Sequence, residues 1–395
     1  MFVASSRGRR VTGGFTLIEL MVGIVIGLLT TAVIAQVLYV AEGFRRSASS
    51  GSDAQVTGAL GLYAIERELR VAGYGLASAA DVLGCTLKAK YAGADMNLLP
   101  ATLTPVTITV GAGEAPDTIR MIGFQTRTDA AGGRGATFSM PTALLPPYYD
   151  PADQSAGGKA FRFPVTSVVG FAANDLAVAA VPKATSECQL FQVTSLAAGG
   201  LMRDDDAKWN PNGWPTVKYG SNAMVVNLGA IRDIRFGVQD GKLQSRIVDT
   251  GLTTGAAPAL GDWQDLQANI VNMKALFGKD TKTAAALVPP TRTVDTYTSD
   301  APTAAEWQER RVIAVRVAVL VRSGQYEKEE VVGDDDPAFY WNIGSGVTVP
   351  AGAVDCPTGG GKCIKLKHDF STDWKHYRYK MFETVVPLRN MVWFS

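Results

Sequence analysis

The residues closest to a recognisable chemistry lie near the N-terminus, where a single carboxylate meets a long apolar run. Residues 20–41 contain no charged side chain, and Glu19 stands directly before them. A helix rises about 1.5 Å per residue, so this run spans roughly 33 Å, enough to cross the hydrocarbon core of a membrane. An ionisable group at the edge of such a segment needs a partner, a proton or water. Glu19 is therefore the first candidate functional residue.

The leader in front of this run indicates how the chain lies in a membrane. Its charged residues are Arg7, Arg9 and Arg10, and the positive-inside rule places them in the cytoplasm. In an ordinary secretory signal, small residues follow the apolar stretch and the helix is removed. Here the small pair Gly13-Gly14 precedes the stretch, so the helix is expected to stay with the chain.

The nine residues GFTLIELMV, from Gly14 to Val22, resemble the class III signal of type IV pilins and type II secretion pseudopilins. The resemblance implies that a prepilin peptidase cuts between Gly14 and Phe15 and that the new amino terminus of Phe15 is methylated. It also implies that Glu19 contacts the amino terminus of a neighbouring subunit during assembly. Phe15 and Glu19 lie one helical turn apart, so they can also satisfy each other within one chain. The alternative is a plain membrane anchor in which Glu19 is incidental.

Other residues capable of binding metals or catalysing reactions lack the partners that such chemistry requires. Calcium prefers clustered carboxylates, but neither Asp204–Asp206 nor Asp334–Asp336 has the alternating spacing of an EF-hand. The Gly359–Lys362 run fails as a phosphate loop because cysteines stand where Gly and Ser or Thr are needed. His368 and His376 have no motif partners. We expect no enzyme activity, no metal site and no cofactor.

Charge and composition describe a near-neutral, glycine-rich protein. The chain of 395 residues has 38 basic and 37 acidic side chains, and loss of the three leader arginines leaves 35 against 37. Such a chain has no general electrostatic attraction to nucleic acids, so we predict no direct binding to them. The 41 glycines and modest charge suit a loop-rich extracellular β protein.

All four cysteines follow the apolar run, and an even number in an exported chain indicates disulfides. Three connectivities are formally possible. Cys356 and Cys363 flank a short Pro-Thr-Gly-Gly-Gly-Lys loop, so their pairing is favoured and leaves Cys85 with Cys188. The alternative is buried free thiols.

A single long helix is expected to carry the apolar run and continue beyond it. No proline occurs before Pro100, so a helix over residues 15–72 meets no hard stop. Its second half is amphipathic, with the rows Val56-Leu60-Tyr63 and Leu62-Ile65-Leu69 at helical spacing. Gly58 and Gly61 weaken it and allow a bend. Gly73 and Gly75 are natural terminators, and the second half is expected to pack on a soluble domain.

The remainder, residues 73–395, is dominated by short β-type runs. Strands are predicted at 106–110, 118–122, 188–193 and 224–228, with a hairpin of 231–238 and 242–248 about Asp240-Gly241. Residues 312–322 alternate cleanly, and their partly apolar second face predicts a central strand.

Two short helices are expected within this β-rich region. Residues 263–277 place Leu266, Ile270, Met273 and Phe277 on one face after a possible N-cap, Asp262. The second begins with the capping box Thr303–Glu306 and runs to about residue 311. The loop aromatics Tyr148, Tyr149, Trp209 and Trp214 are expected to pack these loops down, with partner contact as the alternative.

The predicted class is therefore α+β: a leader at 1–14, a long helix at 15–72 whose first half spans a membrane, and a large β-rich domain at 73–395. The strand 318–323 and the tail 376–393, with its Leu-Arg-Asn ending, resemble the PilW family of type IV pilus minor pilins. That family is related to the J-type minor pseudopilins.

The resemblance implies a minor pilin that helps to prime pilus assembly and stays at or near the tip. Its partners would be other minor pilins, the major pilin, a prepilin peptidase and a tip adhesin. The chain would first be held in the inner membrane with its β domain in the periplasm, and later reach the cell surface. Two alternatives stay open: a J-type pseudopilin of type II secretion, and a tip adhesin or DNA-uptake component.

Overall fold

The computed structural model describes residues 13–128, 132–154, 158, 161–183, 187–281, 291–344 and 353–393, with backbone alone at 44 and 46–50. The chain separates into two compact units, Met1–Ser52 and Asp53–Ser395. Of the predicted leader, only Gly13 and Gly14 are described; Arg7, Arg9 and Arg10 lie outside the described residues.

One helix, α1 (Leu17–Val71), accounts for the helix predicted over residues 15–72. It ends where the glycines predict: Gly73 and Gly75 have φ of +72° and +80°, a region that glycine enters without a steric penalty. The Gly73 amide then donates to the carbonyl of Ile122, so the end of the helix is joined directly to a strand.

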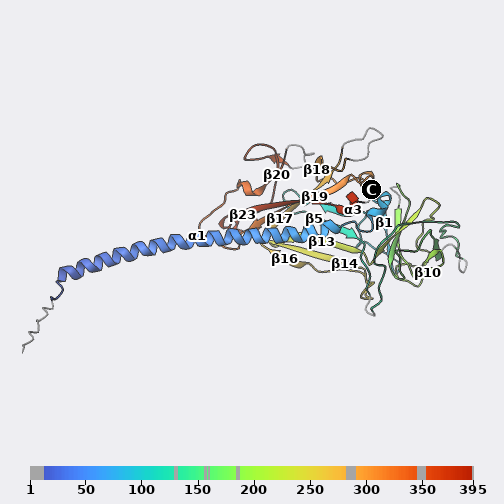
Figure 1. Cartoon of the computed structure of the whole chain (residues 1–395), viewed down its shortest axis with the longest axis horizontal. Helices are drawn as coiled ribbons and strands as arrows, with labels where there is room; N and C mark the ends of the chain where they lie inside the picture. Colours follow the sequence, from blue (N-terminus) through green and yellow to red (C-terminus); the bar gives the residue numbers. More distant parts are fainter. Residues whose placement is uncertain are drawn as a thin grey trace, which may run out of the picture. The chain divides into compact units, whose positions relative to one another are not determined.

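The last part of α1 lies within the main hydrophobic core of the second unit, between two sheets (Figure 1). Leu62, Ile65 and Leu69 are buried there. A six-stranded sheet has the order β15-β14-β13-β5-β4, with β16 also paired to β14: β4 (Val106–Thr109), β5 (Thr118–Gly123), β13 (Arg232–Gln239), β14 (Lys242–Asp249), β15 (Ala259–Leu260) and β16 (Gln264–Ala268). A four-stranded sheet has the order β18-β17-β19-β23: β17 (Ile270–Lys279), β18 (Thr296–Thr298), β19 (Val312–Arg322) and β23 (Tyr379–Pro387).

Most of the predicted β elements in these sheets are confirmed. The hairpin β13–β14 turns at Asp240 and Gly241, whose φ values of +50° and +70° fit a type I′ turn. Strand β19 is central, with Val315, Val317, Val319 and Val321 facing the core that holds α1 and Ala318 and Leu320 facing the other side.

The helix predicted over residues 263–277 is wrong. Those residues form β16 and most of β17, separated by Asn269 at φ +62°. Every residue of β17 is buried, with Met273 and Phe277 on the α1 side and Leu276 on the other. Asn272 and Lys274 alternate with Met273 and Ala275, as expected of a strand, but both polar residues are buried, and Ile270, Met273 and Phe277 also fit a helical period. Leu266, assigned to the buried face, is 37% exposed.

The capping box at Thr303 is confirmed in a shorter helix, α2 (Ala304–Gln308). The Glu306 amide donates to Thr303 Oγ1 at 3.2 Å, and the Thr303 amide donates to Glu306 Oε2 at 2.7 Å. Glu306 Oε1 also accepts a hydrogen bond from Lys279 Nζ at 2.9 Å, which links α2 to β17.

A second group of strands has its own core. A five-stranded sheet, β1-β9-β8-β12-β6, faces a three-stranded sheet, β10-β11-β7. The strands are β1 (Thr86–Lys88), β6 (Thr142–Ala143), β7 (Arg162–Pro164), β8 (Leu176–Ala180), β9 (Glu187–Gln192), β10 (Ser195–Ala197), β11 (Gly200–Met202) and β12 (Met224–Gly229). Strands β9 and β12 are the predicted strands 188–193 and 224–228.

Aromatic side chains fill this second core. Phe163 stacks between Tyr149 and Phe191, with ring centroids 4.1 and 4.4 Å apart. Trp214 is buried, and its Nε1 donates to the carbonyl of Leu190 at 2.7 Å, whereas Trp209 is buried in the main core. The aromatic residues of the long loops therefore hold the loops down, as predicted, and Tyr148 is partly buried with them.

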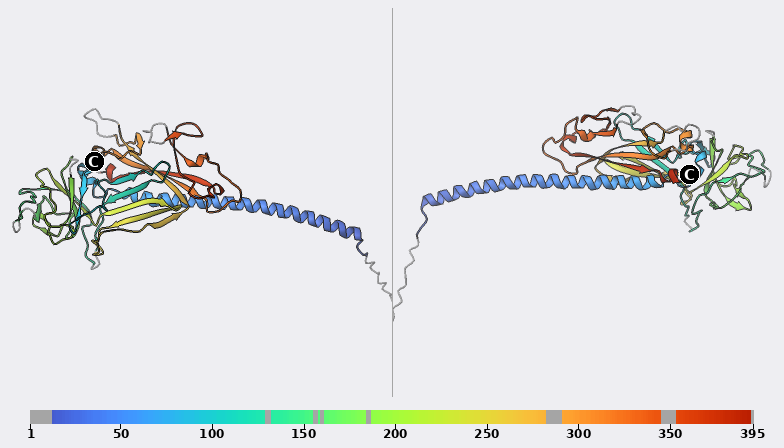
Figure 2. Two further views of the ribbon diagram at one scale, coloured as in Figure 1. Left: turned by 180° about the vertical axis from the view of Figure 1, so that it is seen from behind. Right: turned by 45° about the horizontal axis from the view of Figure 1, so that its top comes forward.

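A third, smaller core lies on the outer face of the four-stranded sheet, under the sheet β20-β22-β21. Figures 1 and 2 show this layer and the second group of strands toward opposite ends of the second unit. The remaining elements are β2 (Lys90–Tyr91), β3 (Ala94–Asp95), β20 (Tyr340–Gly344), β21 (Val354–Asp355), β22 (Lys362–Lys365), η1 (Ala77–Val82), η3 (Pro337–Phe339), η4 (Trp374–His376) and α3 (Arg389–Trp393).

The structure contains both disulfides that were predicted from the short loop between Cys356 and Cys363. Cys85 and Cys188 join the start of β1 to its parallel neighbour β9 across 103 residues of chain. Cys356 and Cys363 close the short glycine loop in front of β22. Among the described residues there is no free cysteine.

Two side chains that approach glycines of α1, and one buried carboxylate of α1, hold the last part of this helix against the sheets. A Cβ on Gly58 would come 2.4 Å from the ring of Phe382, and one on Gly61 would come 2.4 Å from Ile270. These glycines, interpreted from the sequence as bend points, are places where side chains of β23 and β17 reach the helix backbone. Glu68, 4% exposed, accepts Arg232 Nε of β13 at 2.8 Å.

The C-terminal Leu-Arg-Asn sequence also contacts the end of α1. The Leu388 side chain is buried and its amide donates to the carbonyl of Ile313. Asn390 Nδ2 donates at 3.0 Å to the carbonyl of Ala72, one of the acceptors left open at a helix end. The C-terminal tail therefore caps the C-terminal end of α1.

Substitution of Arg232 by Ala should destabilise the protein because it removes a main partner of a buried carboxylate. We expect a loss of about 1–3 kcal/mol in the free energy of unfolding. The matched control is Arg70→Ala, which breaks an exposed pair with Glu66 and should cost no more than about 1 kcal/mol. Urea denaturation of the full chain in detergent, followed by tryptophan fluorescence, measures both. Equal effects of the two variants would contradict a role for Glu68 in seating α1.

Candidate functional site

The candidate site at the N-terminus is a set of hydrogen bonds between Thr16 and Glu19. The Thr16 amide and its hydroxyl both donate to Glu19 Oε2, each at 2.9 Å, and the Glu19 amide donates to Thr16 Oγ1 at 3.3 Å. Thr16 stands directly before the first residue of α1, so the arrangement is a capping box. It satisfies amide groups that would otherwise lack an acceptor at the start of an apolar helix.

Thr16 is the site residue that the sequence interpretation missed. From the sequence, Glu19 could contact Phe15 or a neighbouring subunit, whereas both described hydrogen bonds to its carboxylate come from Thr16. The signal was available, because Thr-Leu-Ile-Glu before an apolar run is the sequence form of a capping box. Both bonds end on Oε2, and no bond to Oε1 occurs among the described residues.

The helix that follows is suited to a membrane. Residues Leu17–Gly43 have a mean hydropathy of 2.4, and none of them is buried within the protein. By length and composition this segment can cross a bilayer. Its threonines add no unsatisfied polar group, because Thr30 and Thr31 donate their hydroxyls to the carbonyls of Ile26 and Gly27.

The two aspartate runs are occupied by local contacts. Asp205 pairs with Arg203 at 2.6 Å. In the other run, Asp336 accepts the amide of Ala338 at 2.9 Å and Asp335 accepts the hydroxyl of Tyr340 at 3.1 Å. In the part of the chain that is described, no three metal-ligating side chains lie together.

The histidines and the glycine loop take part in packing. His368 stacks on Phe339 with ring centroids 3.6 Å apart, and His376 stacks on Tyr326 at 4.7 Å. Gly359, Gly360 and Gly361 all have positive φ in the loop closed by a disulfide. Neither arrangement resembles a phosphate site or a catalytic pair.

One apolar row of α1 is left without cover in the second unit. Leu62, Ile65 and Leu69 are buried, but Val56, Leu60 and Tyr63 on the opposite face are 56, 47 and 62% exposed. These three residues, called the outer row below, lie at helical spacing i, i+4 and i+7. Contiguous apolar surface of this kind is typical of protein–protein contact.

Loss of the Thr16 side chain should loosen the start of α1. Thr16→Ala removes an N-cap, so amide hydrogens in the first turn should exchange roughly fivefold faster, whereas Thr16→Ser should exchange at the wild-type rate. Thr31→Ala, which removes a hydroxyl from the middle of the helix, is the control. The measurement is hydrogen exchange of the full chain in detergent micelles. Unchanged exchange in Thr16→Ala would show that the capping box does not stabilise the helix.

Two family models match separate parts of the chain. The model described as type IV pilus-assembly protein W matches residues 236–390, and the prokaryotic N-terminal methylation motif matches residues 9–35. A search of curated proteins gave no match.

Among solved structures, a type IV-like pilin from Thermus thermophilus is similar over 56% of this chain and 87% of its own, with 14% identity and a TM-score of 0.21. A score this low carries no structural conclusion. The PilW model covers the second half of β13 and all of β14, β17, β19 and β23. The methylation motif covers the Gly14–Glu19 segment and the first part of the apolar helix. The apolar helix and the methylation motif fit a membrane-anchored pilin. Residues 236–390 therefore carry a PilW domain and residues 9–35 a prokaryotic methylation motif, and the combination is that of a type IV pilin-like minor pilin.

Proposed function

We propose that this minor pilin helps to prime assembly of a type IV pilus and remains at or near the pilus tip. The observation that carries the proposal is the combination of a methylation motif, a membrane-length helix with Glu19 at its start, and a PilW domain. The large β domain suits a rare initiating subunit better than the repeating one of a fibre. The proposed role is non-enzymatic.

Maturation would begin with the prepilin peptidase. Cleavage of the Gly14–Phe15 peptide bond would make Phe15 the first residue and free its amine. The same enzyme would then transfer a methyl group from a methyl donor to that amine. The matured chain would wait in the inner membrane, held by Leu17–Gly43, with its β domain in the periplasm. Two disulfides support this placement, because disulfides persist in oxidising compartments and are rare in the cytosol.

Glu19 is proposed to dock the subunit against its neighbours. Its Oε2 caps its own helix, which leaves Oε1 to accept a hydrogen bond from the amino terminus of an adjacent chain. In an apolar surrounding a charge pair of this kind is much stronger than in water, and an unpaired carboxylate is costly. The geometry lets one side chain serve both its own helix and a partner.

The outer row offers a second lateral contact. Val56, Leu60 and Tyr63 form an apolar stripe that suits packing against an apolar helix face of another pilin. Other minor pilins, the major pilin and a tip adhesin are the proposed partners.

Deletion of the gene should reduce surface pili, and the wild-type gene should restore them. A Glu19→Ala gene should restore a processed, membrane-bound protein without restoring pili, because docking is lost and cleavage is not. Glu42→Ala, which changes a carboxylate beyond the apolar run, is the control and should restore pili. Pili, type II secretion and DNA uptake are scored side by side by microscopy and functional assays.

The same experiment separates the alternatives. Normal piliation with Glu19→Ala would contradict the docking role. Loss of secretion with pili intact would favour a pseudopilin, and loss of adhesion or uptake with normal pilus numbers would favour a tip receptor.

A charge in the outer row should weaken association without unfolding the domain. Leu60→Glu introduces a carboxylate on an exposed side chain, so the midpoint of urea denaturation should stay within error of the wild type. Co-purification with other pilins should fall severalfold. Gln55→Glu adds the same charge to the same helix outside the row and should leave co-purification unchanged. Equal co-purification of both variants would remove the outer row from the assembly surface.

A further inference from the structure

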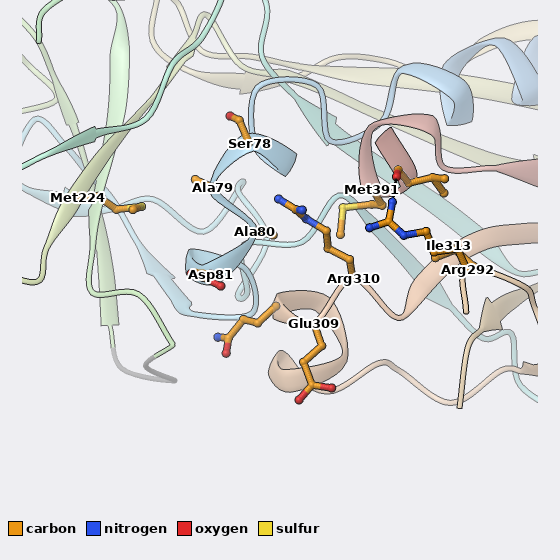
Figure 3. A pocket seen from close by; sticks show the side chains of 12 residues that line it. Ser78, Ala79, Ala80, Asp81, Met224, Arg292, Glu309, Arg310, Ile313 and Met391 are labelled. Atoms are coloured by element: carbon orange, nitrogen blue, oxygen red, sulfur yellow. Dashed lines mark hydrogen bonds between the residues drawn. The ribbon is translucent and has the colours of Figure 1, made fainter. Parts of the chain in front are cut away.

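A pocket of about 390 Å³ lies where η1, the end of α2, β19 and the C-terminal helix α3 meet (Figure 3). Its walls include Ala79, Ala80, Ile313 and Met391, and Met224 of β12 also lines it. The volume lies within the range of small-ligand sites, roughly 300–1,000 Å³. Figure 3 shows two arginines, Arg292 and Arg310, extending toward the space between η1 and α3.

Both arginines are held in place by the protein but are not neutralised by it. Arg310 Nη2 donates to the carbonyl of Ala77 at 3.0 Å, while its buried Nε has no hydrogen-bond partner. Arg292 Nη1 donates to the carbonyl of Val392, and the Arg292 amide donates to buried Asp280 at 2.9 Å. Neither guanidinium forms an ion pair with any described carboxylate. A carbonyl satisfies a donor but leaves the charge uncompensated.

The charge balance of the pocket favours a single negative charge. Two carboxylates line it, and one of them, Glu309, is paired with Arg311. Two guanidiniums therefore face one remaining carboxylate, that of Asp81. The two guanidiniums exceed Asp81 by one positive charge, so a monoanion would balance the pocket, whereas a dianion would leave it with an excess negative charge.

The surroundings of Arg310 disfavour its charged form when no anion is bound. Burial lowers the pKa of Arg310, and the neighbouring charge of Arg292 lowers it further, while Asp81 acts in the opposite direction. A lowered pKa in a cation means that its charged form is destabilised where it stands. An anion placed between the two guanidiniums would relieve both effects.

We propose that this pocket binds the side-chain carboxylate of an aspartate or glutamate presented by another pilin subunit. The two guanidiniums would bind the carboxylate, and the alanine, isoleucine and methionine side chains would contact its carbon stem. The identity of the partner as a pilin rests on the proposed function, but the specificity for a peptide carboxylate does not. The site is distinct from Glu19 and from the outer row.

The direct test is chemical protection of the full wild-type chain in detergent. Phenylglyoxal modifies accessible arginines, and mass spectrometry reports modification at Arg292 and Arg310 separately from Arg389. Three probes are compared at equal concentration and ionic strength: N-acetylglutamate α-amide, its neutral glutamine analogue, and inorganic phosphate. The proposal predicts protection of Arg292 and Arg310 by the glutamate probe alone.

Variants give the second measurement. Arg310→Gln and Arg292→Gln should each weaken binding of the glutamate probe, measured by calorimetry, at least about tenfold. Arg389→Gln removes an exposed arginine of α3 that does not line the pocket, and it should bind as the wild type does. Thermal denaturation of each variant identifies any that fails to fold.

Each outcome decides the proposal. Equal protection by phosphate would replace it with a general anion site, and no protection by any probe would overturn it, as would wild-type affinity in both pocket variants. Because the probe is a small molecule, these results do not depend on whether pili assemble. A pilus defect in Glu19→Ala with normal probe binding, or the reverse, therefore separates failure of one proposal from failure of the other.

Discussion

The burial of one helix stripe between two sheets is the constraint on which the second unit depends. Strands β4, β5, β13 and β14 reach α1 from one sheet and β17, β19 and β23 from another, and all contribute to the same core. Two glycines on the helix admit Phe382 and Ile270, and the buried carboxylate of Glu68 fixes the register through Arg232. Displacing the helix would expose Ile65 and Leu69 to water and break the ion pair between buried Glu68 and Arg232. The outer face of the same helix is thereby left for other molecules.

Local chemistry made parts of this fold predictable. Asp240-Gly241 and Thr303–Glu306 are signals in which side-chain type dictates backbone geometry within four residues, and both are confirmed. The alternating residues of β19 were equally clear because its two faces differ in composition. The limits of α1 followed from an apolar run without proline and from glycines at its end.

The rest required long-range information that no local pattern carries. Strand β17 was mistaken for a helix because Ile270, Met273 and Phe277 fit a helical period, and because the polar Asn272 and Lys274 that alternate with its core residues are themselves buried. The two apolar rows of α1 look alike in sequence, and only the packing distinguishes the buried row from the exposed one. Thr16 was readable but overlooked. The pocket of Arg292 and Arg310 combines segments more than 200 residues apart, so its composition was not accessible before the fold.

The Cys85–Cys188 bond has a mechanical meaning. It joins neighbouring strands β1 and β9, so the chain between the two cysteines, whose sequence separation is 103, forms a covalent side loop. A fully extended chain reaches about 3.4 Å per residue, so roughly 350 Å of contour cannot be drawn out while the bond is intact. Tension entering through α1 and leaving through a contact beyond β9 would bypass strands β1 to β8, which lie between the two cysteines. The bond thus limits how far this subunit can lengthen under load.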